Sequence, residues 1–286
     1  NSYLEYPDGF KYNLRKIIYQ SPSKDEIKIV ENELTILHAN LVNDFLKTNN
    51  ICAQEIDLIA FHGHTILHNV AKKISWQIGN CTLLADLCKI NVVGDFRIAD
   101  VANNGQGAPL VPIYHLNLLK KEIEPTATLN IGGISNITYF ENNDENHLIA
   151  FDVCFGNSPL DDLVKTKTGL NYDEDGKLAR SGKINQKLAD KILTNNIFSQ
   201  PPPKSFDRDE FKKAVEYINQ LDIQDALATL CYVLAKSVQI NLKFLAHKPK
   251  KIYLCCGGRK NHFLVEQLKI TLKNIDVINI DEIGFN

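Results

Sequence analysis

Short apolar runs alternate with longer amphipathic stretches along this chain, and this alternation constrains its fold more than any other feature. Each apolar run is short enough to be a buried strand; the clearest are residues 127–131, 135–140, 147–153 and 251–256. Helical spacing marks the segments between and around them, at residues 24–47, 158–168, 207–221, 223–244 and 263–272. Alternation of this kind is typical of α/β proteins. We therefore expect an α/β fold.

The first part of the chain has a weaker pattern. Apolar residues recur three and four positions apart between residues 24 and 47, which predicts one helix with a single apolar face. Residues 56–61 and 90–93 are expected to be buried strands that end in polar loops. Residues 102–112 are rich in Gly, Asn and Pro and are expected to form an irregular loop.

Composition excludes several classes of protein. Lys and Arg total 32 of the 286 residues against 34 for Asp and Glu, so there is no basic excess that would favour nucleic-acid binding. No run approaches 18 consecutive apolar residues, so no membrane-spanning segment is expected. The seven cysteines are an odd number spread along the chain, which favours free thiols and a cytoplasmic location.

Two glycine pairs follow strand-like runs. Gly132-Gly133 lies between two of them, and Gly257-Gly258 lies between a strand and a helix. Glycine lets the backbone approach an anion and direct N–H groups at it, so both pairs are candidates for phosphate or nucleotide binding. Ordinary turn glycines are the alternative. Neither pair matches a P-loop or a dinucleotide-binding fingerprint.

Two carboxylates also follow apolar runs. Asp152 comes after residues 148–151, where it could act as a general base or could cap the helix expected from Ser158. Asp95 follows the run at 90–93, and Arg97 beside it could bind a carboxylate or phosphate in bidentate fashion. A structural Asp–Arg pair is the alternative. The residues alone do not decide between these alternatives.

Other polar clusters have simpler interpretations. His62, His64 and His68 could share a metal, as in a metal-dependent hydrolase, but a loop that hydrogen-bonds a polar ligand is favoured. The acidic residues 173–176 lack a complete calcium-loop pattern and are expected to be a solvated turn. Lys204 and Arg208 are expected to be surface charges rather than phosphate ligands.

Several longer motifs, taken in order, resemble the anhydro-N-acetylmuramic acid kinase family. They are GHT (63–65), GDFRIADV (94–101), GQGAPLVP (105–112), LNIGGISNIT (129–138), FD (151–152) with GN (156–157), YDEDG (172–176), PPPKS (201–205) and GG (257–258). The resemblance implies two ribonuclease-H-like domains of the actin/hexokinase/Hsp70 (ASKHA) type around a nucleotide cleft. It places a sugar-binding domain at residues 1–125 and a nucleotide-binding domain at residues 126–286.

The resemblance also implies an activity. Family members use ATP and Mg²⁺ to convert 1,6-anhydro-N-acetylmuramic acid to N-acetylmuramic acid 6-phosphate in peptidoglycan recycling, and Asp152 matches the base that activates water. Gly132, Gly133 and Asn136 match the phosphate hairpin, and Gly257, Gly258 and Asn261 match the adenosine side. Gly63, His64, Thr65 and Arg97 match sugar contacts. A homodimer is implied as well, with no nucleic-acid or membrane partner.

The chain also departs from the family pattern. It is expected to begin after the family's first phosphate-loop hairpin and to end before the closing acidic helix. Val153-Cys154-Phe155 stands where the family has Thr-Gly-Pro, which is expected to add bulk near the phosphate path. The alternative hypothesis is therefore a truncated or impaired member that binds sugar or nucleotide without turnover.

Overall fold

The computed structural model describes residues 3–285, except for the side chains of Ala71, Arg208, Asp209 and Ala214. The expected surface position of Arg208 therefore lies outside the described side chains. Contacts divide the chain into two compact units, Asn1–Gly107 and Ala108–Asn286. Residues 108–125, which the sequence analysis placed in the first domain, are grouped with the second unit. The functional division at residue 125 stays a prediction.

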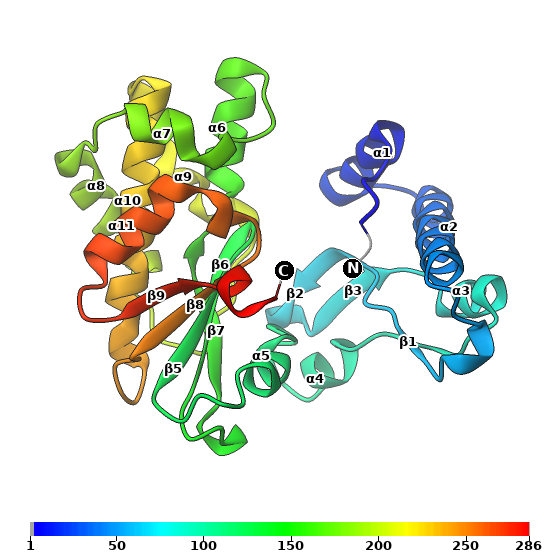
Figure 1. Cartoon of the computed structure of the whole chain (residues 1–286). Helices are drawn as coiled ribbons and strands as arrows, with labels where there is room; N and C mark the ends of the chain where they lie inside the picture. Colours follow the sequence, from blue (N-terminus) through cyan, green and yellow to red (C-terminus); the bar gives the residue numbers. More distant parts are fainter. Residues whose placement is uncertain (1–2, 286) are drawn as a thin grey trace. The chain divides into compact units, whose positions relative to one another are not determined.

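A five-stranded sheet organises the second unit (Figure 1). Its strands are β5 (Thr126–Ile131), β6 (Ile134–Phe140), β7 (Ile149–Phe155), β8 (Lys251–Cys255) and β9 (Asp276–Asn279), in the order β7-β6-β5-β8-β9. The β6 strand is antiparallel to β5 and β7, whereas β5, β8 and β9 run parallel. This is the strand order of a ribonuclease-H-like domain, and the α/β prediction is confirmed.

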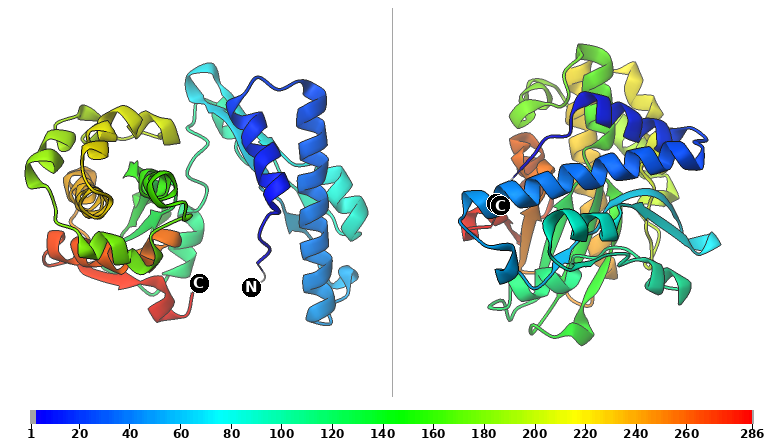
Figure 2. Two further views of the ribbon diagram at one scale, coloured as in Figure 1. Left: turned by 90° about the horizontal axis from the view of Figure 1, so that it is seen from above. Right: turned by 90° about the vertical axis from the view of Figure 1, so that its right-hand side faces the viewer.

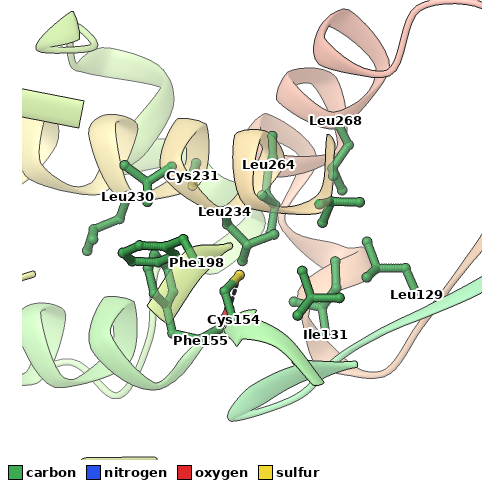
Figure 3. Packing of buried hydrophobic residues seen from close by; sticks show 14 of the residues in the cluster. Leu129, Ile131, Cys154, Phe155, Phe198, Leu230, Cys231, Leu234, Leu264 and Leu268 are labelled. Atoms are coloured by element: carbon green, nitrogen blue, oxygen red, sulfur yellow. Dashed lines mark hydrogen bonds between the residues drawn. The ribbon is translucent and has the colours of Figure 1, made fainter. Parts of the chain in front are cut away.

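The main core lies between one face of this sheet and the helices. These helices are α6 (Ser158–Thr168), α7 (Lys177–Ser181), α8 (Gln186–Leu193), α9 (Lys212–Val215), α10 (Ile223–Asn241) and α11 (His262–Thr271). Leu129 and Ile131 of β5 are fully buried against Leu234 of α10 and Leu264 of α11 (Figure 3). Alternate residues of β5 point to opposite faces, so Asn130 faces away from this core.

The other face of the sheet is covered in part by α5 (Pro112–Leu118). Leu116 and Leu119 pack there against Phe140 and Tyr253. His115 of the same helix is 5% exposed, and its Nδ1 lies 2.7 Å from Thr128 Oγ1 and 3.0 Å from Thr138 Oγ1. Polar contacts as well as apolar packing therefore join α5 to β5 and β6.

The first unit combines two long helices with two small sheets. Helices α1 (Asp8–Tyr19) and α2 (Lys24–Thr48) lie side by side (Figure 2). They pack together through apolar side chains. Parallel strands β1 (Ile59–Ala60) and β4 (Val92–Val93) form one sheet, and the antiparallel hairpin of β2 (His64–Asn69) and β3 (Ile74–Ile78) forms the other. The remaining helices of this unit are α3 (Cys81–Cys88) and α4 (Ile98–Ala102).

Helix α2 confirms the spacing-based prediction, and its start has a local cause. Ser23 Oγ accepts a hydrogen bond from the Glu26 N–H, while the Glu26 carboxylate accepts one from the Ser23 N–H. This capping box satisfies donors that a helix leaves unpaired at its first turn.

The structure differs from the predicted elements in three places. The β2–β3 hairpin was not expected, because its turn has no glycine; Lys73 takes the left-handed conformation instead, with φ of 55°. Residues 207–221 do not form one helix but the short pieces Arg208–Phe211, Lys212–Val215 and Glu216–Gln220. Spacings of three and four are also compatible with alternating 3₁₀ and α turns. The strands expected at 56–61 and 90–93 are two residues long.

All seven cysteines are free, as predicted. Cys88, Cys154 and Cys231 are buried among apolar side chains, which raises the thiol pKa of Cys154 to about 12. Over residues 3–285, none of the helices combines the length and apolar character needed to cross a membrane.

The buried His115 predicts a pH-dependent stability. Burial lowers its pKa to about 4, whereas an unfolded histidine titrates near pH 6.5, so the unfolded chain binds the proton first as the pH falls. Protonation of the unfolded His115 should therefore lower the free energy of unfolding by about 2 kcal/mol between pH 7 and pH 5. Urea unfolding of wild type and His115→Gln measures the contribution as the difference between their pH slopes. Equal slopes would contradict it.

Candidate functional site

A polar row crosses the sheet of the second unit. In the strand register Asn130 of β5 lies opposite Asn136 of β6, and Asn136 lies opposite Asp152 of β7. Residues directly opposite each other share one face of a sheet. The Oδ1 atoms of Asn130 and Asn136 are buried and have no hydrogen-bond partner within residues 3–285. Since buried acceptors are nearly always paired, these two amides are available to a ligand or ordered water.

Asp152 lies within β7 and not at its end, so this detail of the sequence prediction was wrong. The strand continues through Val153, Cys154 and Phe155 because these three side chains are buried in the main core. The N-cap of α6 is Asn157, five residues further on, so the helix-capping alternative for Asp152 is also wrong. The added bulk of Val153-Cys154-Phe155, which the sequence predicted, therefore lies in the main core.

Backbone groups of another segment hold Asp152. Its Oδ2 accepts a hydrogen bond of 2.8 Å from the Phe206 N–H. Its own N–H donates to the Lys204 carbonyl at 3.2 Å. The carboxylate therefore has a defined position beside Asn136.

The Gly132-Gly133 turn packs against the loop that leads into α6. The Gly132 carbonyl accepts a hydrogen bond of 2.7 Å from the Asn157 N–H, and the Gly133 carbonyl accepts one of 2.8 Å from the Gly156 N–H. Within the described chain, the N–H groups of Gly132 and Gly133 donate no hydrogen bond outside the strand ladders. The carbonyls are thus occupied while the N–H groups remain available, as an anion-binding turn requires.

The second glycine pair lies in a short 3₁₀ helix, Gly257–Lys260, and not in the simple turn that was predicted. Gly258 is buried, and a Cβ there would collide with the Ile131 side chain. Gly257 is exposed. Asn261 Oδ1 accepts the Leu264 N–H at 3.0 Å and so caps α11.

A cavity of about 480 Å³ lies between this segment, the start of α6 and the acidic loop. Asn157, Asp173, Gly257, Lys260 and Asn261 are among its lining residues. A larger cavity of about 710 Å³, beside the C-terminal ends of α10 and α11, contains none of the predicted site residues and has mainly exposed lysines among its charged groups. The smaller cavity is therefore the better candidate site.

The acidic loop was predicted to be a solvated turn, which holds for Glu174 and Asp175 but not for Asp173. Asp173 is buried, and its carboxylate accepts hydrogen bonds from the N–H groups of Leu178 and Ala179 at 2.8 and 2.9 Å. These bonds satisfy donors at the first turn of α7. Asp173 thus shapes the cavity wall.

In the first unit, Arg97 joins the residue before the predicted sugar contacts 63–65 to the motif at 105–112. Its Nε donates to His62 Nε2 at 3.1 Å, and its Nη1 donates to the Gly107 carbonyl at 2.6 Å. Gly63 has φ of 69°, and a Cβ there would collide with the Ile78 carbonyl. Glycine is therefore required for the chain to enter β2 at this position.

His64 and His68 lie in β2 and not in the loop that was favoured. Burial lowers the pKa of His64, and the nearby His62 and His38 lower it further.

Thr65 Oγ1 accepts a hydrogen bond from Gln77 Nε2 at 3.2 Å, while the buried Gln77 Oε1 has no partner in the described chain. Over residues 3–285, no three His, Cys, Asp or Glu side chains gather into a metal site.

Sequence reasoning missed Asn130, Gln77 and Lys204. Asn130 could have been found from strand alternation, since it faces away from the core side of residues 127–131. Gln77 lies in the hairpin that was not predicted. Lys204, expected at the surface, is 8% exposed and donates to Asn241 Oδ1 at 2.6 Å. A lysine after three prolines carries no local signal of burial.

Comparison with known proteins identifies the family. A family model described as anhydro-N-acetylmuramic acid kinase matches residues 1–286. The protein of that name from Zymomonas mobilis subsp. mobilis is 44% identical over 252 residues, covering 88% of this chain and 68% of the relative. The one from Paramagnetospirillum magneticum is 40% identical over 264 residues, covering 92% of this chain and 74% of the relative.

Similarity to solved structures is weaker. Component A of the (R)-2-hydroxyglutaryl-CoA dehydratase of Acidaminococcus fermentans superimposes with a TM-score of 0.46 at 8% identity, over 84% of this chain and 76% of that one. The family match over the whole chain and the identity to its curated members are the stronger findings. The chain belongs to the anhydro-N-acetylmuramic acid kinase family.

Proposed function

We propose that this protein is an ATP-dependent sugar kinase that opens the 1,6-anhydro bridge of 1,6-anhydro-N-acetylmuramic acid and phosphorylates O6. The product would be N-acetylmuramic acid 6-phosphate, formed in the cytoplasm during peptidoglycan recycling by a homodimer. The observation that carries the proposal is the row of Asn130, Asn136 and Asp152 next to the Gly132-Gly133 turn. It combines a held carboxylate, two unpartnered amide oxygens and available backbone donors.

ATP would bind along the second unit. Its phosphates would receive hydrogen bonds from the N–H groups of Gly132 and Gly133, with Asn136 beside them. The N-terminal end of α6, eleven residues long, adds partial positive charge. The cavity beside Gly257, Gly258 and Asn261 would hold the adenosine.

Magnesium would accompany ATP. Protein-bound Mg²⁺ keeps several waters and is usually held by one or two carboxylates together with substrate phosphates. The described residues form no dedicated cluster of metal ligands, which suits an ion held mainly by the phosphates. When bound, it would neutralise charge on the phosphoryl group in transfer.

Asp152 would act as the general base. Its carboxylate takes a proton from water as the water oxygen bonds to C1 of the sugar. The C1–O6 bond breaks with its electrons going to O6, and O6 bonds to the γ-phosphorus as ADP leaves. The Phe206 N–H donates to one carboxylate oxygen and so helps to fix the position of the group for this transfer.

The sugar would bind to the first unit through Gly63, His64, Thr65 and Arg97. Arg97 matches the lactyl carboxylate in charge and planar geometry. Burial lowers the pKa of His64 and so favours its neutral form, which can exchange hydrogen bonds with sugar hydroxyls without adding charge. Gln77 Oε1 is an additional acceptor at this hairpin.

Turnover of the full reaction tests the proposal. Purified protein is incubated with ATP, Mg²⁺ and 1,6-anhydro-N-acetylmuramic acid, and the sugar phosphate is followed by mass spectrometry. N-acetylmuramic acid, which lacks the anhydro bridge, is the control sugar and should not be phosphorylated. Binding of sugar and ADP without product would instead support the non-catalytic alternative.

Substitution of the proposed base should slow turnover strongly without weakening the binding of sugar or ADP. Asp152→Asn retains an oxygen that can accept the Phe206 N–H but cannot take a proton, so kcat should fall about 10²- to 10⁴-fold. Sugar and ADP affinities, measured by calorimetry, should stay within about twofold. Asp276→Asn, at an exposed carboxylate of β9, is the matched control. Normal kcat in Asp152→Asn would refute the assignment.

The two glycines of the 3₁₀ segment should respond differently to alanine. In Gly258→Ala the new Cβ meets the Ile131 side chain, so the segment must shift and ADP affinity should fall about tenfold, equivalent to ~1.4 kcal/mol. In Gly257→Ala the nearest protein atom is Asn157 Nδ2 at 3.4 Å, so the segment need not shift and affinity should fall less. Calorimetry with ADP compares them; equal affinities in the two folded variants would contradict the adenosine assignment.

A further inference from the structure

Lys204 is a buried lysine surrounded by aromatic rings. Its Nζ donates to Asn241 Oδ1 and lies 5.6, 5.5 and 5.7 Å from the ring centroids of Phe151, Phe206 and Phe244. Asn241 is fully buried, and its Nδ2 donates to the carbonyls of Phe198 and Ser237. The ammonium is thus fixed in the interior through a chain of hydrogen bonds.

Burying this charge has a cost. Desolvation lowers the pKa of Lys204 to about 8, although Cys154 and Asp152 oppose this change. Among the described side chains, the charged and titratable groups that act on its pKa are Asp152 and Cys154 of β7 and Lys243 of the 3₁₀ turn Leu242–Phe244. A methionine would fill the same space without desolvating a charge, so packing alone does not explain a lysine here.

The backbone around Lys204 connects it to the proposed base. The Lys204 carbonyl accepts the Asp152 N–H, and two residues later the Phe206 N–H donates to Asp152 Oδ2. One three-residue segment therefore contacts Asp152 at both its backbone and its carboxylate. The Lys204 side chain anchors that segment in the core from its first residue.

We propose that Lys204 is a positioning residue for Asp152: its buried ammonium holds the 204–206 backbone against the carboxylate and adds positive charge near it. This inference rests on the proposed function, because it assigns Lys204 a role in supporting the base. It does not require Lys204 to touch ATP or sugar. Its effect on the carboxylate can therefore be measured without turnover.

Two substitutions remove the charge and differ in whether a hydrogen-bonding group is kept. Lys204→Met removes both the charge and the hydrogen bond to Asn241, whereas Lys204→Gln removes the charge and keeps a hydrogen-bonding group. Lys269→Met, at an exposed lysine of α11, is the matched control. Both Lys204 variants should lower kcat about 10- to 100-fold with the ATP KM within about twofold of wild type. The control should match wild type.

The carboxylate itself gives the second readout. In ¹³C spectra of the full chain, with the Asp152 signal assigned from Asp152→Asn, the signal should titrate at a higher pH in Lys204→Gln, by about one pH unit. The acid limb of the pH–kcat profile should move the same way. In wild type, the Asp152 signal should also show a second inflection as Lys204 loses its proton, which needs no variant to fold.

These readouts distinguish the possible failures. A folded Lys204→Gln with wild-type kcat and an unmoved Asp152 titration would overturn the proposal. So would reduced thermal stability with no change in that titration, or a wild-type Asp152 signal without the second inflection. If wild type phosphorylates no sugar but the titration moves as expected, the proposed function fails while the coupling of Lys204 to Asp152 stands.

Discussion

The register of three neighbouring strands determines most of what this fold can do. Because Asn130, Asn136 and Asp152 lie opposite one another across β5, β6 and β7, they share a face of the sheet. Their neighbours along each strand, among them Leu129, Ile137 and Phe151, point into the main core. A shift of one residue in any of these strands would bury a polar side chain and expose an apolar one. The same pairing therefore stabilises the core and assembles the polar row.

Close packing of glycines completes the site. Gly156 lies so near the Gly132 carbonyl that a Cβ would collide with it, and a Cβ on Gly258 would collide with the Ile131 side chain. These contacts bring the β5–β6 turn, the start of α6 and the segment after β8 together. Glycine is therefore needed where these segments meet, because a side chain would force them apart.

Much of the second unit could be predicted from local pattern. Strand-like runs and the long helix α10 are strong signals, and the motif around Gly132 identified the family. Long-range contacts were not predictable in the same way. The position of Asp152 inside β7 depends on residues 153–155 being buried by helices far along the chain. The burial of Lys204 depends on Asn241, which lies 37 residues away. The β2–β3 hairpin was missed because its polar side chains and a lysine in the left-handed conformation give no turn signal.

Family membership and site geometry together support a chemistry in which one water and one phosphoryl group are used on the same sugar. Reaction in H₂¹⁸O with ATP, Mg²⁺ and 1,6-anhydro-N-acetylmuramic acid tests this most directly, with products analysed by mass spectrometry before the anomeric oxygen exchanges with solvent. The account predicts one ¹⁸O atom on C1 of N-acetylmuramic acid 6-phosphate and none in its phosphate. Label in free phosphate without sugar phosphate, or an unlabelled sugar product, would contradict it.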